Sequence, residues 1–80
     1  MEISAQISLY PLGRKKLSPA IEEAWKVIGK YDILVEKGAM STVLTGDREE
    51  IFNAVKETFE KLSEKGMLVL TVTFSNACPV

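Results

Sequence analysis

The 80-residue sequence contains no histidine and only one cysteine, Cys78. Histidine is the commonest metal ligand and general base near neutral pH, so its absence counts against several classes of enzyme. A single cysteine cannot form an internal disulfide, and nothing near Cys78 in the sequence would lower its pKa and activate the thiol. We therefore expect neither a catalytic residue nor a metal site in this chain.

The sequence also lacks a long apolar run and an excess of either charge. No segment approaches the roughly 20 apolar residues that a membrane-spanning helix needs, and the first residues have no signal-peptide pattern. Ten Lys and Arg against eleven Asp and Glu leave a net charge of −1, so no basic surface is expected to gather the phosphates of a nucleic acid. These features predict a cytoplasmic protein whose partners include neither membrane nor nucleic acid.

Two kinds of hydrophobic repeat organise the chain. Residues 2–10 and 67–75 alternate between apolar and polar side chains, which predicts strands with one buried face. Residues 33–36 and 40–46 are short β-rich runs separated by a turn, which predicts an antiparallel hairpin. The chain is thus expected to contribute four strands.

Two helices are expected between these strands. Ser18 and Pro19 fit the start of the first helix, and its predicted apolar stripe is Ile21, Ala24, Trp25 and Ile28. Asp47 is the predicted N-cap of the second helix, with Glu50 reaching back to the cap. The stripe predicted for the second helix is Ile51, Val55, Phe59 and Leu62.

The resulting order, βαββαβ, is the ferredoxin-like pattern. The expected fold class is α+β, a four-stranded antiparallel sheet with two helices on one face, built as a single domain over residues 1–80. So small a domain has a thin stability margin, which association with further copies would increase. The uncovered sheet face should carry small, moderately polar residues in place of charges: Ser4, Gln6, Ser8, Tyr10, Val69, Thr71 and Thr73. Such a face suits a second sheet or a ligand, although β-propensity alone also accounts for its threonines.

Three segments carry a family resemblance: AQISLYPLG at residues 5–13, GAMSTVLTGD at 38–47 and FNAVKETFEKLSEKGMLVLTVTF at 52–74. Taken in this order, they resemble the YkoF-related family of small thiamin-binding proteins over nearly the whole chain. The resemblance implies ferredoxin-like domains that pair through their sheets, with the ligand held beside the sheet. For this chain it implies a homodimer or homotetramer that binds thiamin or hydroxymethylpyrimidine, with no other cofactor and no catalysis.

By position, the resemblance places ligand contacts on Ser41 and Thr42 and on the polar face of the first strand, which carries Gln6, Ser8 and Tyr10. An aminopyrimidine offers ring nitrogens as acceptors and an amino group as a donor, which hydroxyl and amide groups can satisfy. Adjacent strand residues point to opposite faces, so Ser41 and Thr42 cannot both line one pocket unless a bulge or strand end turns one of them. Which of the two faces the ligand stays open, and Trp25 is assigned to the core.

Other functions remain open from the sequence. A regulatory domain of the same fold could sense a metabolite, and an acylphosphatase-like hydrolase also combines βαββαβ order with a basic loop after the first strand. Arg14 lies in that loop, but the only asparagines, Asn53 and Asn76, fall in the second helix and the tail. Residues 14–16 could also hold a phosphate at the helix start, although a solvated loop is the simpler interpretation. RNA recognition is disfavoured because Tyr10 is the only aromatic residue expected on the uncovered face.

Overall fold

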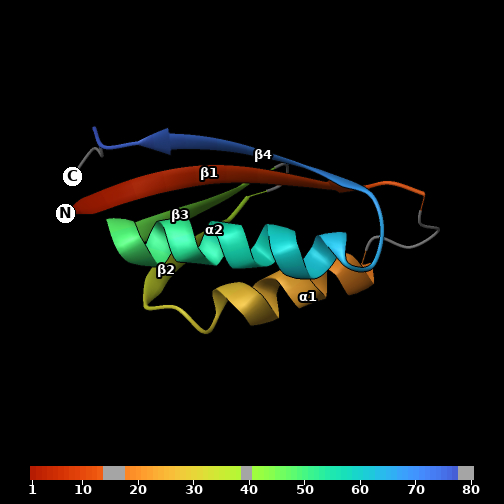
Figure 1. The fold of residues 1–80 in the computed structure, drawn as a ribbon. Helices are drawn as coiled ribbons and strands as arrows, with labels where there is room; N and C mark the ends of the chain where they lie inside the picture. The colour runs from red at the N-terminus through yellow and green to blue at the C-terminus, as the bar shows by residue number, and fades with distance from the viewer. Residues whose placement is uncertain (14–17, 39–40, 78–80) are drawn as a thin grey trace.

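The computed structural model describes residues 1–13, 18–38 and 41–77, so the predictions made for Arg14, Lys15, Lys16, Met40 and Cys78 lie outside the described residues. Its elements are β1 (Glu2–Pro11), α1 (Ser18–Ile28), β2 (Ile33–Lys37), β3 (Thr42–Asp47), α2 (Arg48–Ser63) and β4 (Leu68–Ser75). The strands form one antiparallel sheet in the order β2-β3-β1-β4, and both helices lie on the same side of it (Figure 1). The predicted ferredoxin-like α+β fold is confirmed.

The alternation of β1 determines which side of the sheet forms the core. Ile3, Ala5 and Ile7 are buried, and Ala5 lies opposite Leu44 of β3, which is also fully buried. These side chains form the main core cluster together with Ile28 of α1 and Ile51 of α2. The even-numbered residues of β1 consequently face the side that no helix covers (Figure 1).

The buried side of α2 differs from the predicted one. Its buried residues are Ile51, Ala54, Thr58 and Leu62. Phe59 was predicted to be buried and is 46% exposed, so that prediction was wrong. The Thr58 hydroxyl donates a hydrogen bond to the Ala54 carbonyl oxygen at 2.7 Å, which satisfies a polar group inside the core. Since the short Ala54 side chain also allows close packing, α2 turns these two residues inward and Phe59 outward.

The first turn of α2 is held by carboxylates. Asp47 is the N-cap, as predicted, and its carboxylate accepts a hydrogen bond from the Glu49 N–H at 3.2 Å. The N-terminal ammonium, 3.3 Å away, and the Glu49 N–H lower the pKa of Asp47 from its usual value of 3.8. Glu50 was expected to reach back to the cap, but its Oε1 accepts from the Asp32 N–H at 3.1 Å. This carboxylate therefore connects α2 to the turn before β2.

Glu57 forms a second connection between α2 and the same turn. Its carboxylate accepts hydrogen bonds from the Lys30 ammonium and the Tyr31 hydroxyl. Those two donors, Lys30 first, lower the pKa of Glu57 below its usual value of 4.5. The hydrogen bond to Glu57 in turn raises the pKa of Tyr31 above 10.0, because ionising the phenol would remove its proton from that bond.

We expect the stabilising effect of Glu57 to depend on pH. A carboxyl whose pKa is lower in the folded state stabilises the fold above its unfolded-state pKa, here near 4.5, and loses this effect as the pH falls through the folded-state value. The variant Glu57→Gln should therefore melt at a lower temperature than the wild type near neutral pH. The difference should shrink progressively below pH 4.5. Thermal denaturation of both proteins across the acid range measures it.

The matched control is Glu60→Gln, which removes the same charge from an exposed position of α2. It should leave the melting temperature nearly unchanged at every pH in the series. A difference between wild type and Glu57→Gln that stays constant as the pH falls would contradict the assignment.

Candidate functional site

A cavity of about 260 Å³ lies between the helices and the sheet, and α1 lines it with Ile21, Ala24 and Trp25. One wall contains the indole of Trp25, and four lining residues carry hydroxyl groups: Ser8, Ser41, Thr42 and Thr58. The other lining residues are apolar or glycine: Ile7, Leu9, Ile21, Ala24, Gly38 and Leu70. Sites for drug-sized ligands span about 300–1,000 Å³, so this cavity suits a compact molecule.

The turn before β3 fixes the position of Thr42. The Gly38 N–H donates to the Ser41 carbonyl oxygen at 2.8 Å, which closes the β2–β3 hairpin. A Cβ atom at position 38 would lie 2.9 Å from that oxygen, so the turn requires glycine. Thr42 follows as the first residue of β3 and pairs with Ile7, which places its side chain on the helix-covered face.

Thr42 is the polar group of the sheet best placed to meet a molecule in the cavity. It is 6% exposed and lines the cavity wall. Its hydroxyl can both donate and accept a hydrogen bond at the cavity wall. Thr58 also lines the cavity, but its proton is already donated to Ala54. The two threonines thus offer a donor and an acceptor at one cavity.

Ser41 directs its side chain to the opposite side of the sheet. Its Oγ accepts a hydrogen bond of 3.1 Å from Gln6 Nε2, and Gln6 lies on the exposed, uncovered face. Ser41 and Thr42 therefore face opposite sides, as the alternation of strand residues predicts. The hydroxyl group that faces the helices and the cavity belongs to Thr42.

The five residues proposed from the sequence fall into two groups. Ser8, Ser41 and Thr42 border the cavity, although alternation along β1 turns the Ser8 side chain toward the uncovered face. Gln6 and Tyr10 are outside the cavity wall; Tyr10 is 63% exposed and lies opposite Val69 on the uncovered face. The structure does not bring these five side chains together around one cavity.

Trp25, which was expected to belong to the core, also lines the cavity. It is half-buried and packs against the main core cluster. The ammonium of Lys37 lies 4.7 Å from the centre of its ring. The sequence did contain a signal for this role of Trp25: it is the only tryptophan of the chain, in a helical stripe otherwise made of Ile and Ala.

Neither a metal cluster nor a membrane helix is found in the part of the chain that the structure describes. Within residues 1–13, 18–38 and 41–77, no three Asp, Glu or Cys side chains gather closely enough to hold a metal ion. Within the same ranges, no helix is both long and apolar enough to cross a membrane.

The sheet, its two helices and the cavity between them define the class of this protein, a ferredoxin-like α+β domain with a partly open site of small-molecule size. The chain belongs to the YkoF-related family, whose model matches residues 2–80. The family resemblance identified in the sequence is thereby confirmed.

Proteins of known structure share this fold. The UPF0045 protein MJ1052 of Methanocaldococcus jannaschii is 44% identical over 57 residues, which is 70% of this chain and 57% of that protein. The aligned part is thus less than two thirds of that relative's length. Its crystal structure superposes with a TM-score of 0.86 and 33% identity, covering 96% of this chain and 81% of that chain.

A second similar structure belongs to a protein with a suggested function. The Thermotoga maritima protein TM0486, for which a role in thiamine biosynthesis or salvage has been suggested, superposes with a TM-score of 0.81 and 25% identity. The superposition covers 94% of this chain and 83% of that chain. A domain of unknown function from Bacillus cereus, with a TM-score of 0.79 and 19% identity over 94% of this chain and 75% of that chain, shares the fold.

Proposed function

We propose that this protein binds thiamin or its hydroxymethylpyrimidine half in the cavity beside Trp25, and that it acts as a homo-oligomer without catalysing a reaction. The observation that carries the proposal is the pairing of an aromatic wall with two threonine hydroxyls in a cavity of about 260 Å³. Membership of the YkoF-related family and similarity to a protein linked with thiamine metabolism support the choice of ligand.

The polar groups of the cavity complement an aminopyrimidine. The Thr42 hydroxyl can donate to a ring nitrogen, while the Thr58 oxygen can accept from the exocyclic amino group because its own proton is held by Ala54. The indole of Trp25 supplies a flat apolar surface for the ring. The proposal includes binding but no catalysis; the described lining residues are serine, threonine, tryptophan, glycine and aliphatic residues.

The uncovered sheet face supports the oligomer. Strands β1, β3 and β4 present serine, threonine, glutamine and valine side chains on this face, including Gln6, Val43, Thr71 and Thr73. Leu34 of β2 and Val69 of β4 lie on the same face and are 61% and 50% exposed. Such a surface is less charged than a freely solvated sheet face, and covering it with the sheet of another copy would remove these apolar groups from water.

The binding site is tested by two substitutions at neighbouring positions. Thr42→Val keeps the shape of the side chain and removes the hydroxyl that faces the cavity, whereas Ser41→Ala removes the hydroxyl that faces Gln6. A lost hydrogen bond together with an unpaired ligand atom costs about 1–3 kcal/mol, so Thr42→Val should weaken binding by about tenfold. Ser41→Ala should change the affinity less than twofold, a limit on the order of calorimetric error. Calorimetric titration with thiamin and with hydroxymethylpyrimidine gives both values.

The pattern of the two variants decides the outcome. Wild-type affinity in both variants would remove Thr42 from the site, and the reverse pattern would move the ligand to the uncovered face beside Ser41. If the wild-type protein bound neither compound, the thiamin proposal would fail and a metabolite-sensing domain with another ligand would become the better hypothesis.

A further inference from the structure

One charged side chain lies beside the cavity wall, although the described lining residues are all uncharged. Lys37 is the last residue of β2, and its neighbours include three residues that line the cavity. It precedes Gly38 in the chain, pairs with Thr42 across the β2–β3 ladder, and places its ammonium 4.7 Å from the centre of the Trp25 ring. The Lys37 ammonium therefore stands next to the site proposed above.

The positive charge of Lys37 is not neutralised by a neighbouring carboxylate. Lys37 forms no ion pair within residues 1–13, 18–38 and 41–77. The adjacent Glu36 pairs with Val43, so strand alternation directs it to the uncovered face, opposite to Lys37. Glu57, next to the lining residue Thr58, already binds Lys30 and Tyr31. Lys37 consequently places a positive charge beside the cavity that no carboxylate of the described residues neutralises.

A positive charge beside the cavity has different effects on the two rings of thiamin, because the rings differ in charge. The thiazolium ring carries a permanent positive charge, the aminopyrimidine is neutral near pH 7, and a phosphate ester of the hydroxymethyl group carries a charge of about −1.5 to −2. The Lys37 ammonium over the indole also repels a second cation, so this ring attracts a thiazolium less strongly. The limited volume, about 260 Å³, favours one ring over two joined rings for the same site.

We propose that Lys37 determines the specificity of the cavity, so that it selects hydroxymethylpyrimidine and its phosphate ester over intact thiamin. This inference rests on the proposed function and specifies the ligand of the same site. Lys37 does not line the cavity and acts on the ligand through its charge. Its contribution to the difference in affinity between ligands should therefore decrease as the salt concentration rises. The Debye length is about 8 Å at physiological ionic strength, so salt only partly screens a charge that lies beside the cavity. We expect the Lys37 charge to change the affinities of charged ligands by about three- to tenfold.

The experiment compares Lys37→Gln, which removes the charge, with Lys37→Arg, which keeps it. Because Trp25 is the only tryptophan, its selectively excited fluorescence reports ligands that reach this cavity. Three compounds are titrated into the wild type and both variants: hydroxymethylpyrimidine, its phosphate ester and thiamin. Thermal melting of each variant confirms that it is folded.

The wild type and Lys37→Arg should bind the phosphate ester most tightly and thiamin most weakly. Lys37→Gln should bind the ester about three- to tenfold more weakly and thiamin about three- to tenfold more tightly, with the neutral pyrimidine changed less than about twofold. Raising the salt concentration should reduce the ratio between ester and thiamin in the wild type but not in Lys37→Gln.

Equal shifts for all three compounds in Lys37→Gln would overturn the inference, since they would show that Lys37 only supports the packing of Trp25. Unchanged affinities in that variant would overturn it as well, while leaving the proposed function intact. Absence of binding by the wild type to any of the three compounds would instead overturn the proposed function, and the specificity with it.

Discussion

Replacing Leu44 with alanine is expected to lower the free energy of unfolding by about 2–5 kcal/mol. Leu44 is fully buried on β3, between β2 and β1, and belongs to the main core cluster. Truncating it loses the transfer free energy of three carbon atoms and leaves a cavity that strands on both sides prevent from closing. A chain of 80 residues has a total stability of about 4–12 kcal/mol, so this one substitution should leave the protein marginally folded.

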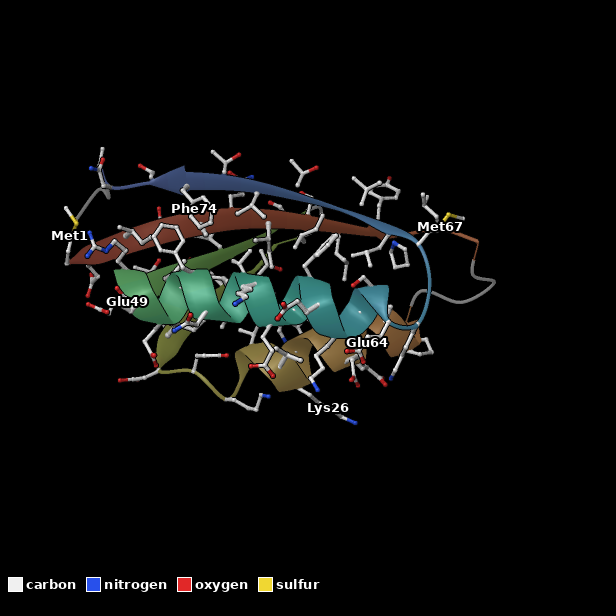
Figure 2. The ribbon with its side chains drawn as sticks, viewed as in Figure 1. Met1, Lys26, Glu49, Glu64, Met67 and Phe74 are labelled. Carbon is white, nitrogen blue, oxygen red and sulfur yellow. The ribbon has the colours of Figure 1, made fainter. Side chains whose placement is uncertain are left out.

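Urea denaturation at fixed protein concentration measures the loss, since assembly would make the midpoint depend on concentration. The control is Met67→Ala, at a residue that is 72% exposed and lies at the far end of β4 from Phe74 (Figure 2). This control should cost less than about 0.5 kcal/mol. Comparable losses in the two variants would show that Leu44 does not lie in the core.

Introducing lysine at Thr71 should dissociate the oligomer. Thr71 lies in β4 opposite Ser8, and its side chain is exposed on the uncovered sheet face. If two sheets pack through this face, the new ammonium becomes buried without a partner in every copy, at a cost of about 3–5 kcal/mol. The association constant should fall by more than about a hundredfold.

Sedimentation velocity over a concentration series measures this change. Asn53→Lys adds the same charge at an exposed position of α2, away from the sheet face, and should leave the assembly unchanged. A wild-type protein that sediments as a monomer at concentrations on the order of tens of micromolar would refute the oligomer. An oligomer that survives Thr71→Lys would place the interface on another surface, such as the aromatic pair Phe52 and Phe74 between α2 and β4.

The strands could be predicted well from the sequence. In an alternating pattern either the odd-numbered or the even-numbered residues face the core, and the two sets differ sharply in hydrophobicity. Ile3, Ala5 and Ile7 are buried as the pattern required. The helical stripe of α2 could not be fixed in the same way. Apolar residues occupy one broad sector of this helix, so small rotations of the helix bury similar numbers of them. The Thr58 to Ala54 hydrogen bond, which makes a buried threonine acceptable, is visible only in the folded chain.

The candidate site was predictable in part. The resemblance pointed to Ser41 and Thr42, and strand geometry implied that they face opposite ways. Choosing between them required the β1–β3 register, which pairs Thr42 with Ile7, 35 positions earlier in the chain, and cannot be obtained from local patterns. The role of Trp25 in the cavity wall depends likewise on how α1 crosses the sheet. Side chains that meet only through tertiary packing leave no periodic signal in the sequence.

The two edge strands of the sheet differ in how well their residues protect them from pairing with another chain. β2, at one edge, carries Glu36 and Lys37, whereas β4, at the other, runs from Leu68 to Ser75 without a charged residue or a proline. Short uncharged segments rich in β-branched and aromatic residues are the ones that stack into cross-β aggregates when their backbone is exposed. In the native fold, Leu70 and Val72 pack partly buried against the core cluster, which holds this segment in the sheet beside β1. Any loss of core stability therefore also increases the tendency of the chain to aggregate, with β4 as the segment that nucleates it.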